Sequence, residues 1–143
     1  MRGLRALLAA VVLAGVPAVF ADEKPGGLVV IVHPARTGTL GADDVARIYL
    51  GRRRFWDDGA AIVALNLPAG TPVRERFSRR VLRDDSAHLA DYWNAQYFHG
   101  VLPPAVLSSS DAVKRYVAAD RKAIGYIEAG DVDETVRVVL TLE

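Results

Sequence analysis

Residues 48–59 read IYLGRRRFWDDG, and the interpretation of the whole chain starts from this stretch. It has the pattern of a helix end, a glycine stop, a basic tripeptide and an aromatic–acidic turn. Val45, Ile48 and Tyr49 follow one another at the i, i+3, i+4 spacing of a single helix face. Gly51 stands where a glycine commonly follows the last turn of a helix. The stretch therefore predicts a short amphipathic helix that ends just before Gly51.

Strands and helices alternate on both sides of this stretch. Residues 28–33 are a continuous apolar, β-branched run, which is typical of a strand buried on both faces, as in a parallel sheet. Three further strands are expected at residues 62–65, 123–127 and 136–142, and a proline-containing loop at 102–107. Three helices are expected to begin at the capping residues Thr71, Ser86 and Ser110. The alternation predicts an α/β layered fold, with a mixed sheet because the last strands are close in sequence.

The start of the chain has the features of an export signal. Arg2 and Arg5 precede an apolar run at residues 7–16, and Ala21 ends a small-residue cleavage motif. The apolar run is too short to span a bilayer unless it is extended. An uncleaved membrane anchor, which would need such an extension, is the alternative. A lipoprotein anchor is excluded because the chain has no cysteine. We expect a signal peptide at residues 1–21 and a periplasmic mature domain at residues 22–143.

Composition narrows the classes of function. Residues 22–143 suffice for one domain with a real core, but not for two lobes around a cleft. The full chain carries a formal charge of +1, which becomes −1 without Arg2 and Arg5, so nucleic-acid binding gains no support. The absence of cysteine excludes disulfides, thiol catalysis and zinc–thiolate sites. The three histidines share no metal-binding spacing, so neither a metal nor another cofactor is expected.

Four segments, taken in order, resemble the phosphate ABC transporter substrate-binding protein family. They are LVVIVHP (28–34), DDVARIYLGRRRFWDDG (43–59), GTPVRERFSRRVL (70–82) and KAIGYIEAG (122–130). The resemblance covers about residues 28 to 140 and corresponds to one lobe of a two-lobed fold. It implies a three-layer α/β sandwich with a mixed, mostly parallel sheet, like one lobe of a type II periplasmic binding protein. The chain would then be a short, single-lobe member.

The resemblance also implies an oxyanion site at a glycine-rich turn that leads into a helix. Matched on Arg74, the family's first glycine falls on Gly70 and its serine falls on Thr71. Its second glycine and its threonine fall on Pro72 and Val73. The candidate anion ligands that remain are Gly70, Thr71, Val73 and Arg74.

Three donors of the family's site are replaced in this chain. Pro72 has no N–H, Val73 has no hydroxyl, and the upstream arginine position falls near Asn66 or Leu67, which are not basic. Each charge-assisted hydrogen bond of this kind is worth about 1.5–3 kcal/mol, so their loss and that of the second lobe predict weak binding. A plain capped helix without an anion is the alternative.

A second candidate surface is the basic tripeptide with its neighbouring aromatic residue. Arg52, Arg53, Arg54 and Trp56 are candidates for an interface with a phosphate, an acidic partner or an anionic headgroup. The alternative is a solvated loop in which Trp56 fills the edge of the core.

The sequence predicts a binding module and not an enzyme. No nucleophile stands in a recognisable catalytic motif, so no catalytic residue is assigned. Acidic pairs such as Asp57–Asp58 fall in turns and do not form an acid/base pair of the kind that catalysis uses. Two functions stay open. The first is binding of phosphate or another oxyanion for an ABC importer. The second is a periplasmic protein–protein or sensory module that has lost phosphate binding, with a membrane transporter, a sensor protein or a second copy in a homodimer as its partner.

Overall fold

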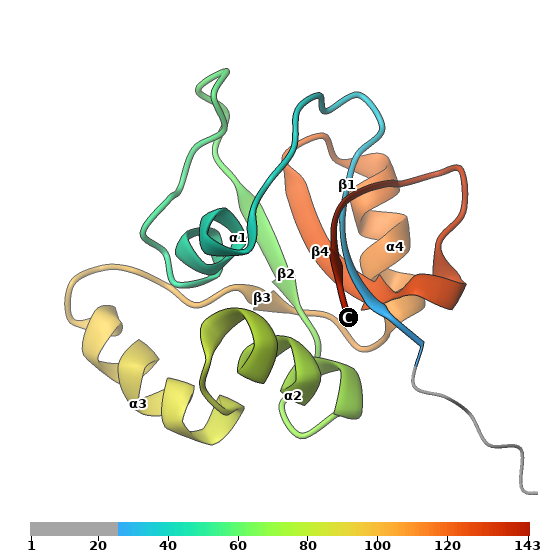
Figure 1. Cartoon of the computed structure of the whole chain (residues 1–143). Helices are drawn as coiled ribbons and strands as arrows, with labels where there is room; N and C mark the ends of the chain where they lie inside the picture. Colours follow the sequence, from blue (N-terminus) through green and yellow to red (C-terminus); the bar gives the residue numbers. More distant parts are fainter. Residues whose placement is uncertain (1–25) are drawn as a thin grey trace, which may run out of the picture.

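The computed structural model describes residues 26–143, so the expected signal peptide lies outside the described residues. Within this range five strands form one open sheet in the order β3-β2-β4-β1-β5 (Figure 1). The strands are β1 (Leu28–Val32), β2 (Val63–Asn66), β3 (Ala105–Val106), β4 (Ala123–Glu128) and β5 (Arg137–Leu142). The helices are α1 (Ala42–Tyr49), α2 (Pro72–Phe77), α3 (Ser86–Tyr97) and α4 (Ser110–Ala119). A π-helical turn, η1 (Ser78–Leu82), continues α2, and a 3-10 turn, η2 (Ala129–Asp131), follows β4.

The predicted mixed sheet is confirmed, although its pairings are evenly divided rather than mostly parallel. β2 runs parallel to β3 and β4, whereas β1 runs antiparallel to β4 and β5. β1 is buried at every position, as the run at residues 28–33 predicted. Its burial on both faces depends on the helices that cover the sheet and not on the direction of its neighbours, which is why the apolar run did not reveal the antiparallel pairing.

Helices cover both faces of the sheet and make the three layers that were predicted. Gly125 and Tyr126 are adjacent in β4, so their side-chain positions face opposite sides of the sheet. A Cβ on Gly125 would lie 2.4 Å from Cγ1 of Val113, which places α4 tightly against that face. Tyr126 contacts the ring of Phe77 on the other face, where α2 and α1 lie (Figure 1). The core therefore has two parts, one on each side of β4 and β1.

The helix starts agree with the sequence to within one residue. Asp85 and Ser109 are the N-cap residues of α3 and α4, instead of the predicted Ser86 and Ser110. The side chain of Asp85 accepts the His88 N–H at 2.8 Å, three residues further on, and Ser109 accepts in the same way. The predicted loop at 102–107 contains the two-residue strand β3. None of the helices in residues 26–143 is long and apolar enough to cross a membrane.

Candidate functional site

The turn before α2, residues 67–71, carries two of the four predicted anion ligands, Gly70 and Thr71, and the other two lie in α2 itself. Gly70 adopts a φ of +86°, in the left-handed region that favours glycine. Thr71 occupies the predicted N-cap position, with Pro72 as the first helical residue. Its hydroxyl does not bond to a helix N–H, however, but donates to the carbonyl of Pro68 at 2.8 Å. The Thr71 hydroxyl therefore closes the turn.

The donors of this turn are partly occupied by a carboxylate of the chain itself. The Gly70 N–H donates to Oε1 of Glu75 at 3.0 Å. The Ser86 hydroxyl, at the start of α3, donates to the same oxygen. These two bonds, first that of Ser86 and then that of Gly70, lower the pKa of Glu75 because they stabilise its charged form. The carboxylate of Glu75 thus occupies a donor that the sequence predicted for a bound anion such as phosphate.

Arg74 provides positive charge beneath the same turn. It is only 8% exposed, and its guanidinium donates to the carbonyl of Leu67 at 2.8 Å and to the Ser78 hydroxyl at 3.4 Å. No carboxylate in residues 26–143 forms an ion pair with it. A buried guanidinium without a carboxylate partner attracts an anion, since burial weakens the screening of its charge.

The structure thus brings Gly70, Thr71 and Arg74 around one turn, whereas the side chain of Val73 packs against the core. Sequence reasoning missed Glu75 and Ser86. Glu75 lies five residues after Gly70, so its spacing offered a weak indication. Ser86 belongs to the next helix and gave no indication at all. Across residues 26–143, no three histidine, aspartate or glutamate side chains gather as metal ligands.

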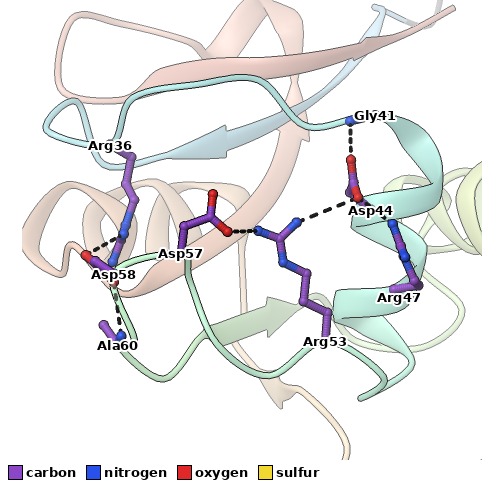
Figure 2. A network of polar contacts seen from close by, with 8 residues as sticks. All are labelled: Arg36, Gly41, Asp44, Arg47, Arg53, Asp57, Asp58 and Ala60. Carbon is purple, nitrogen blue, oxygen red and sulfur yellow. Dashed lines mark hydrogen bonds and ion pairs between the residues drawn. The ribbon is translucent and has the colours of Figure 1, made fainter.

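The three arginines of the basic tripeptide, Arg52, Arg53 and Arg54, differ in whether they form ion pairs. Arg53 lies between two carboxylates, with Asp57 at 3.2 Å and Asp44 at 3.7 Å (Figure 2). The N–H of Gly41 and, after it, the side chain of Arg47 lower the pKa of Asp44. Arg52 and Arg54 are exposed and form no ion pair with any residue in the range 26–143. The positive charges of these two arginines can therefore interact with an anion or an acidic partner.

Trp56 lies at the edge of the core and is almost fully covered. It is 7% exposed, and its indole N–H donates to the carbonyl of Lys122 at 2.9 Å. The guanidinium of Arg36 covers the ring at 4.4 Å from its centroid. The same guanidinium pairs with Asp58 at 2.9 Å (Figure 2). This placement agrees with the alternative in which Trp56 fills the edge of the core, because Arg36 covers one face of the ring and the indole N–H is bonded to the strand region. The interface hypothesis for this segment stays a prediction, and the exposed arginines Arg52 and Arg54 are the residues on which it now rests.

The fold is similar to that of solved proteins of phosphate transport, although the sequence matches no family model. No protein-family model matches the chain, and no curated protein matches it either. Among solved structures, an ABC-type phosphate transport receptor from Vibrio cholerae is 20% identical, with a TM-score of 0.64, over 80% of this chain and 45% of that one. A putative phosphate ABC transporter substrate-binding protein with bound phosphate, from Clostridium perfringens, is 24% identical, with a TM-score of 0.66, over 80% and 44%. PstS from Borrelia burgdorferi is 16% identical, with a TM-score of 0.62, over 80% and 46%.

The chain thus spans less than half the length of each of these three structures. At such identities the similarity is one of fold, and the similar structures are receptors or binding proteins of phosphate transport. The five-stranded mixed sheet with helices on both faces is the fold of one lobe of a phosphate ABC transporter substrate-binding protein.

Proposed function

We propose that this chain is an exported, periplasmic, non-enzymatic binding domain of the phosphate-receptor type, in which the turn before α2 holds free phosphate weakly or not at all. The observation that carries the proposal is the hydrogen bond from the Gly70 N–H to Glu75. Phosphate could take this donor only by displacing Glu75, and its negative charge would then lie beside that carboxylate. Repulsion between the two charges would reduce the affinity further.

Phosphate binding for an ABC importer is the second candidate function, and Arg74 favours it. This buried guanidinium lies under the turn without a carboxylate partner in residues 26–143. The similar Clostridium perfringens structure holds bound phosphate. In that case Glu75 would have to move aside when phosphate binds, and a membrane transporter would be the partner.

Calorimetric titration with phosphate distinguishes the two functions. For the wild-type protein we expect a Kd of about 1 mM or weaker, which corresponds to no more than about 4.1 kcal/mol of binding free energy. Glu75→Gln should bind phosphate more tightly, because it removes the negative charge and keeps the size of the side chain. The matched control is Glu128→Gln, which changes the net charge equally but lies at the end of β4, where Glu128 pairs with Arg76 of α2 and makes no contact with Gly70.

Two results would contradict the proposal. A wild-type Kd of about 1 μM, or about 8.2 kcal/mol, would show a working phosphate site despite Glu75. Equal affinities of Glu75→Gln and Glu128→Gln would show that Glu75 does not compete with phosphate. Arg74→Met tests the second candidate function directly. If the wild-type protein binds phosphate and Arg74→Met does not, the phosphate lies beside Arg74.

A role in protein contact is favoured by two aromatic residues at the end of α3. Tyr97 is 65% exposed and Phe98 is 86% exposed, and their rings lie edge to face with centroids 6.0 Å apart. Exposed aromatic pairs are enriched in protein interfaces. A membrane transporter, a sensor protein or a second copy of this chain is the partner of such a surface.

Sedimentation velocity and cross-linking in whole cells test this role. We expect association or a specific cross-link that is lost when Tyr97 and Phe98 are both changed to Ser. Tyr116→Ser is the control, because Tyr116 is 40% exposed on α4. A wild-type protein that stays monomeric and gives no cross-linked partner would remove the support for protein contact.

A further inference from the structure

A groove of about 480 Å³ lies between the ends of α1 and α3 and the start of β2, at Val63 and Ala64, which the short edge strand β3 does not pair. We call it the β2-edge groove, and it is separate from the turn before α2. Its volume falls in the range of about 300–1,000 Å³ that small-molecule sites occupy. The apolar residues that form its surface include Ile48, Ile62, Ala64, Trp93, Val101 and Pro104.

The walls of the β2-edge groove are held in place by hydrogen bonds. The Tyr92 hydroxyl donates to the carbonyl of Leu50 at 2.7 Å and ties α3 to the end of α1. The Ile62 N–H donates to the carbonyl of Arg54 at 2.9 Å, and Phe55 pairs with Ala61 next to it. The groove is therefore preformed, so that a ligand would not have to order its walls on binding.

The mouth of the groove combines exposed apolar side chains with positive charge. Phe55 is 58% exposed and Leu102 is 69% exposed, and both line the groove. The charged residues that line it are Arg53 and Arg54, and no carboxylate lines it. The charge of Arg53 is compensated by Asp44 and Asp57. Arg54 has no ion-pair partner in residues 26–143, so it is the uncompensated charge of the groove.

We propose that the β2-edge groove binds a small apolar acid, with its hydrocarbon part against Trp93 and Ile62 and its acid group against Arg54. The charge of the lining selects the class of ligand. An anionic amphiphile meets Arg54, whereas a cationic one meets two arginines and no carboxylate, and a neutral one gains no ionic contact. The proposal does not depend on whether phosphate binds near α2, because the two sites share no residue.

Decanoate, below its micelle-forming concentration, is the first probe. Its binding can be followed by the fluorescence of Trp93, since the chain has two tryptophans and Trp56 is buried away from the groove. Anilinonaphthalene sulfonate, an aromatic acid with its own fluorescence, is the second probe. We expect both to bind, decanoate to displace the sulfonate, and decanol and decyltrimethylammonium to compete more weakly.

Arg54→Gln and Arg52→Gln form a matched pair of variants. The two arginines are exposed and belong to the same tripeptide, but only Arg54 lines the groove. We expect Arg54→Gln to weaken decanoate binding about three- to fivefold, the effect of one exposed ion pair, and Arg52→Gln to change it less than about twofold. Binding of decanol should be the same in both variants, and circular dichroism should show that both are folded.

Phe55→Ala and Leu102→Ala test the apolar part of the site. Each should weaken decanoate and decanol alike, because the truncated side chains contact the hydrocarbon part. The proposal would be overturned if neither probe bound at about 1 mM, if decanol bound as tightly as decanoate, or if Arg52→Gln and Arg54→Gln lost affinity equally.

Discussion

The ring of Phe77 lies face to face with the ring of Tyr126, with centroids 3.8 Å apart and planes 3° from parallel. The stack joins α2 to β4, and Tyr49 of α1 packs against Phe77 edge-on at 4.7 Å. The Tyr126 hydroxyl also accepts the Leu67 N–H at 3.2 Å and donates to the side-chain oxygen of Asn66. Burial raises the pKa of Tyr126 to about 12, which keeps the hydroxyl protonated and able to donate. One tyrosine therefore supports both the core and the turn before α2.

Truncation of this stack should be strongly destabilising. We expect Phe77→Ala to lower the free energy of unfolding by about 3–5 kcal/mol, because a fully buried aromatic ring is replaced by a cavity. The control is Phe55→Ala, where the ring is 58% exposed and the loss should stay near 0.5 kcal/mol. Urea denaturation followed by circular dichroism measures both. Equal losses in the two variants would show that the stack adds no stability beyond that of a surface ring.

The sequence predicted the structural features that depend on residues close together in the chain. The apolar face of α1 and the glycine that follows it are local patterns, and Gly51 does adopt a positive φ, of +70°. The contact between Glu75 and Ser86 could not be predicted in this way. Their distance depends on how η1 ends, at Arg83 with a φ of 57°, and on the direction in which α3 then runs. Such contacts are set by tertiary geometry, which periodicity and capping do not describe.

The same limit applies to Trp56 and to the basic tripeptide. An aromatic residue beside arginines has the composition of an interface. The structure instead covers Trp56 with Arg36, which lies 20 residues earlier in the chain, and satisfies Arg53 with Asp44 and Asp57. Composition indicated which side chains are suited to an interface, whereas only the fold decided that Arg54 keeps an exposed and uncompensated charge.

The carboxyl group of Asp133 should titrate at an unusually low pH. The Lys114 ammonium, 2.8 Å away, and then Thr135 lower the pKa of Asp133 from 3.8 to about 2. Because the pKa is lower in the folded state, this group stabilises the fold above pH 3.8, and the contribution is lost as the pH falls from there to about 2. Carboxyl resonances in an NMR titration measure this pKa. Lys114→Met should raise it, and an unchanged midpoint would contradict the role of Lys114.

The expected export signal leads to a prediction about the mature N-terminus. The apolar run at residues 7–16 is followed by Pro17 and by small residues at the cleavage motif that ends at Ala21. This pattern favours cleavage over retention as an anchor. Mass spectrometry of the protein from the periplasmic fraction should therefore find Asp22 as the first residue. An intact Met1 in the membrane fraction would support the anchor instead.

A matched pair of glycines tests how the β2-edge groove is built. Gly51 and Gly59 have φ values of +70° and +83°, so alanine should cost about 1–2 kcal/mol of backbone strain at either position. They differ in their surroundings. A Cβ on Gly51 would lie 2.8 Å from Cγ1 of Val101 and 3.5 Å from the ring of Trp93, whereas a Cβ on Gly59 would have no neighbour within 4 Å.

We therefore expect Gly51→Ala to lower the free energy of unfolding by about 1–3 kcal/mol more than Gly59→Ala, since the new methyl group overpacks the wall of the groove. Val101→Ala should recover part of this difference when it is combined with Gly51→Ala, because it removes the atom that the methyl group meets. Urea denaturation of the single and double variants gives the coupling energy. A shift in Trp93 emission in Gly51→Ala, but not in Gly59→Ala, would place the strain at the groove. Equal stability of the two alanine variants would mean that Val101 gives way freely and that the wall is not fixed at this point.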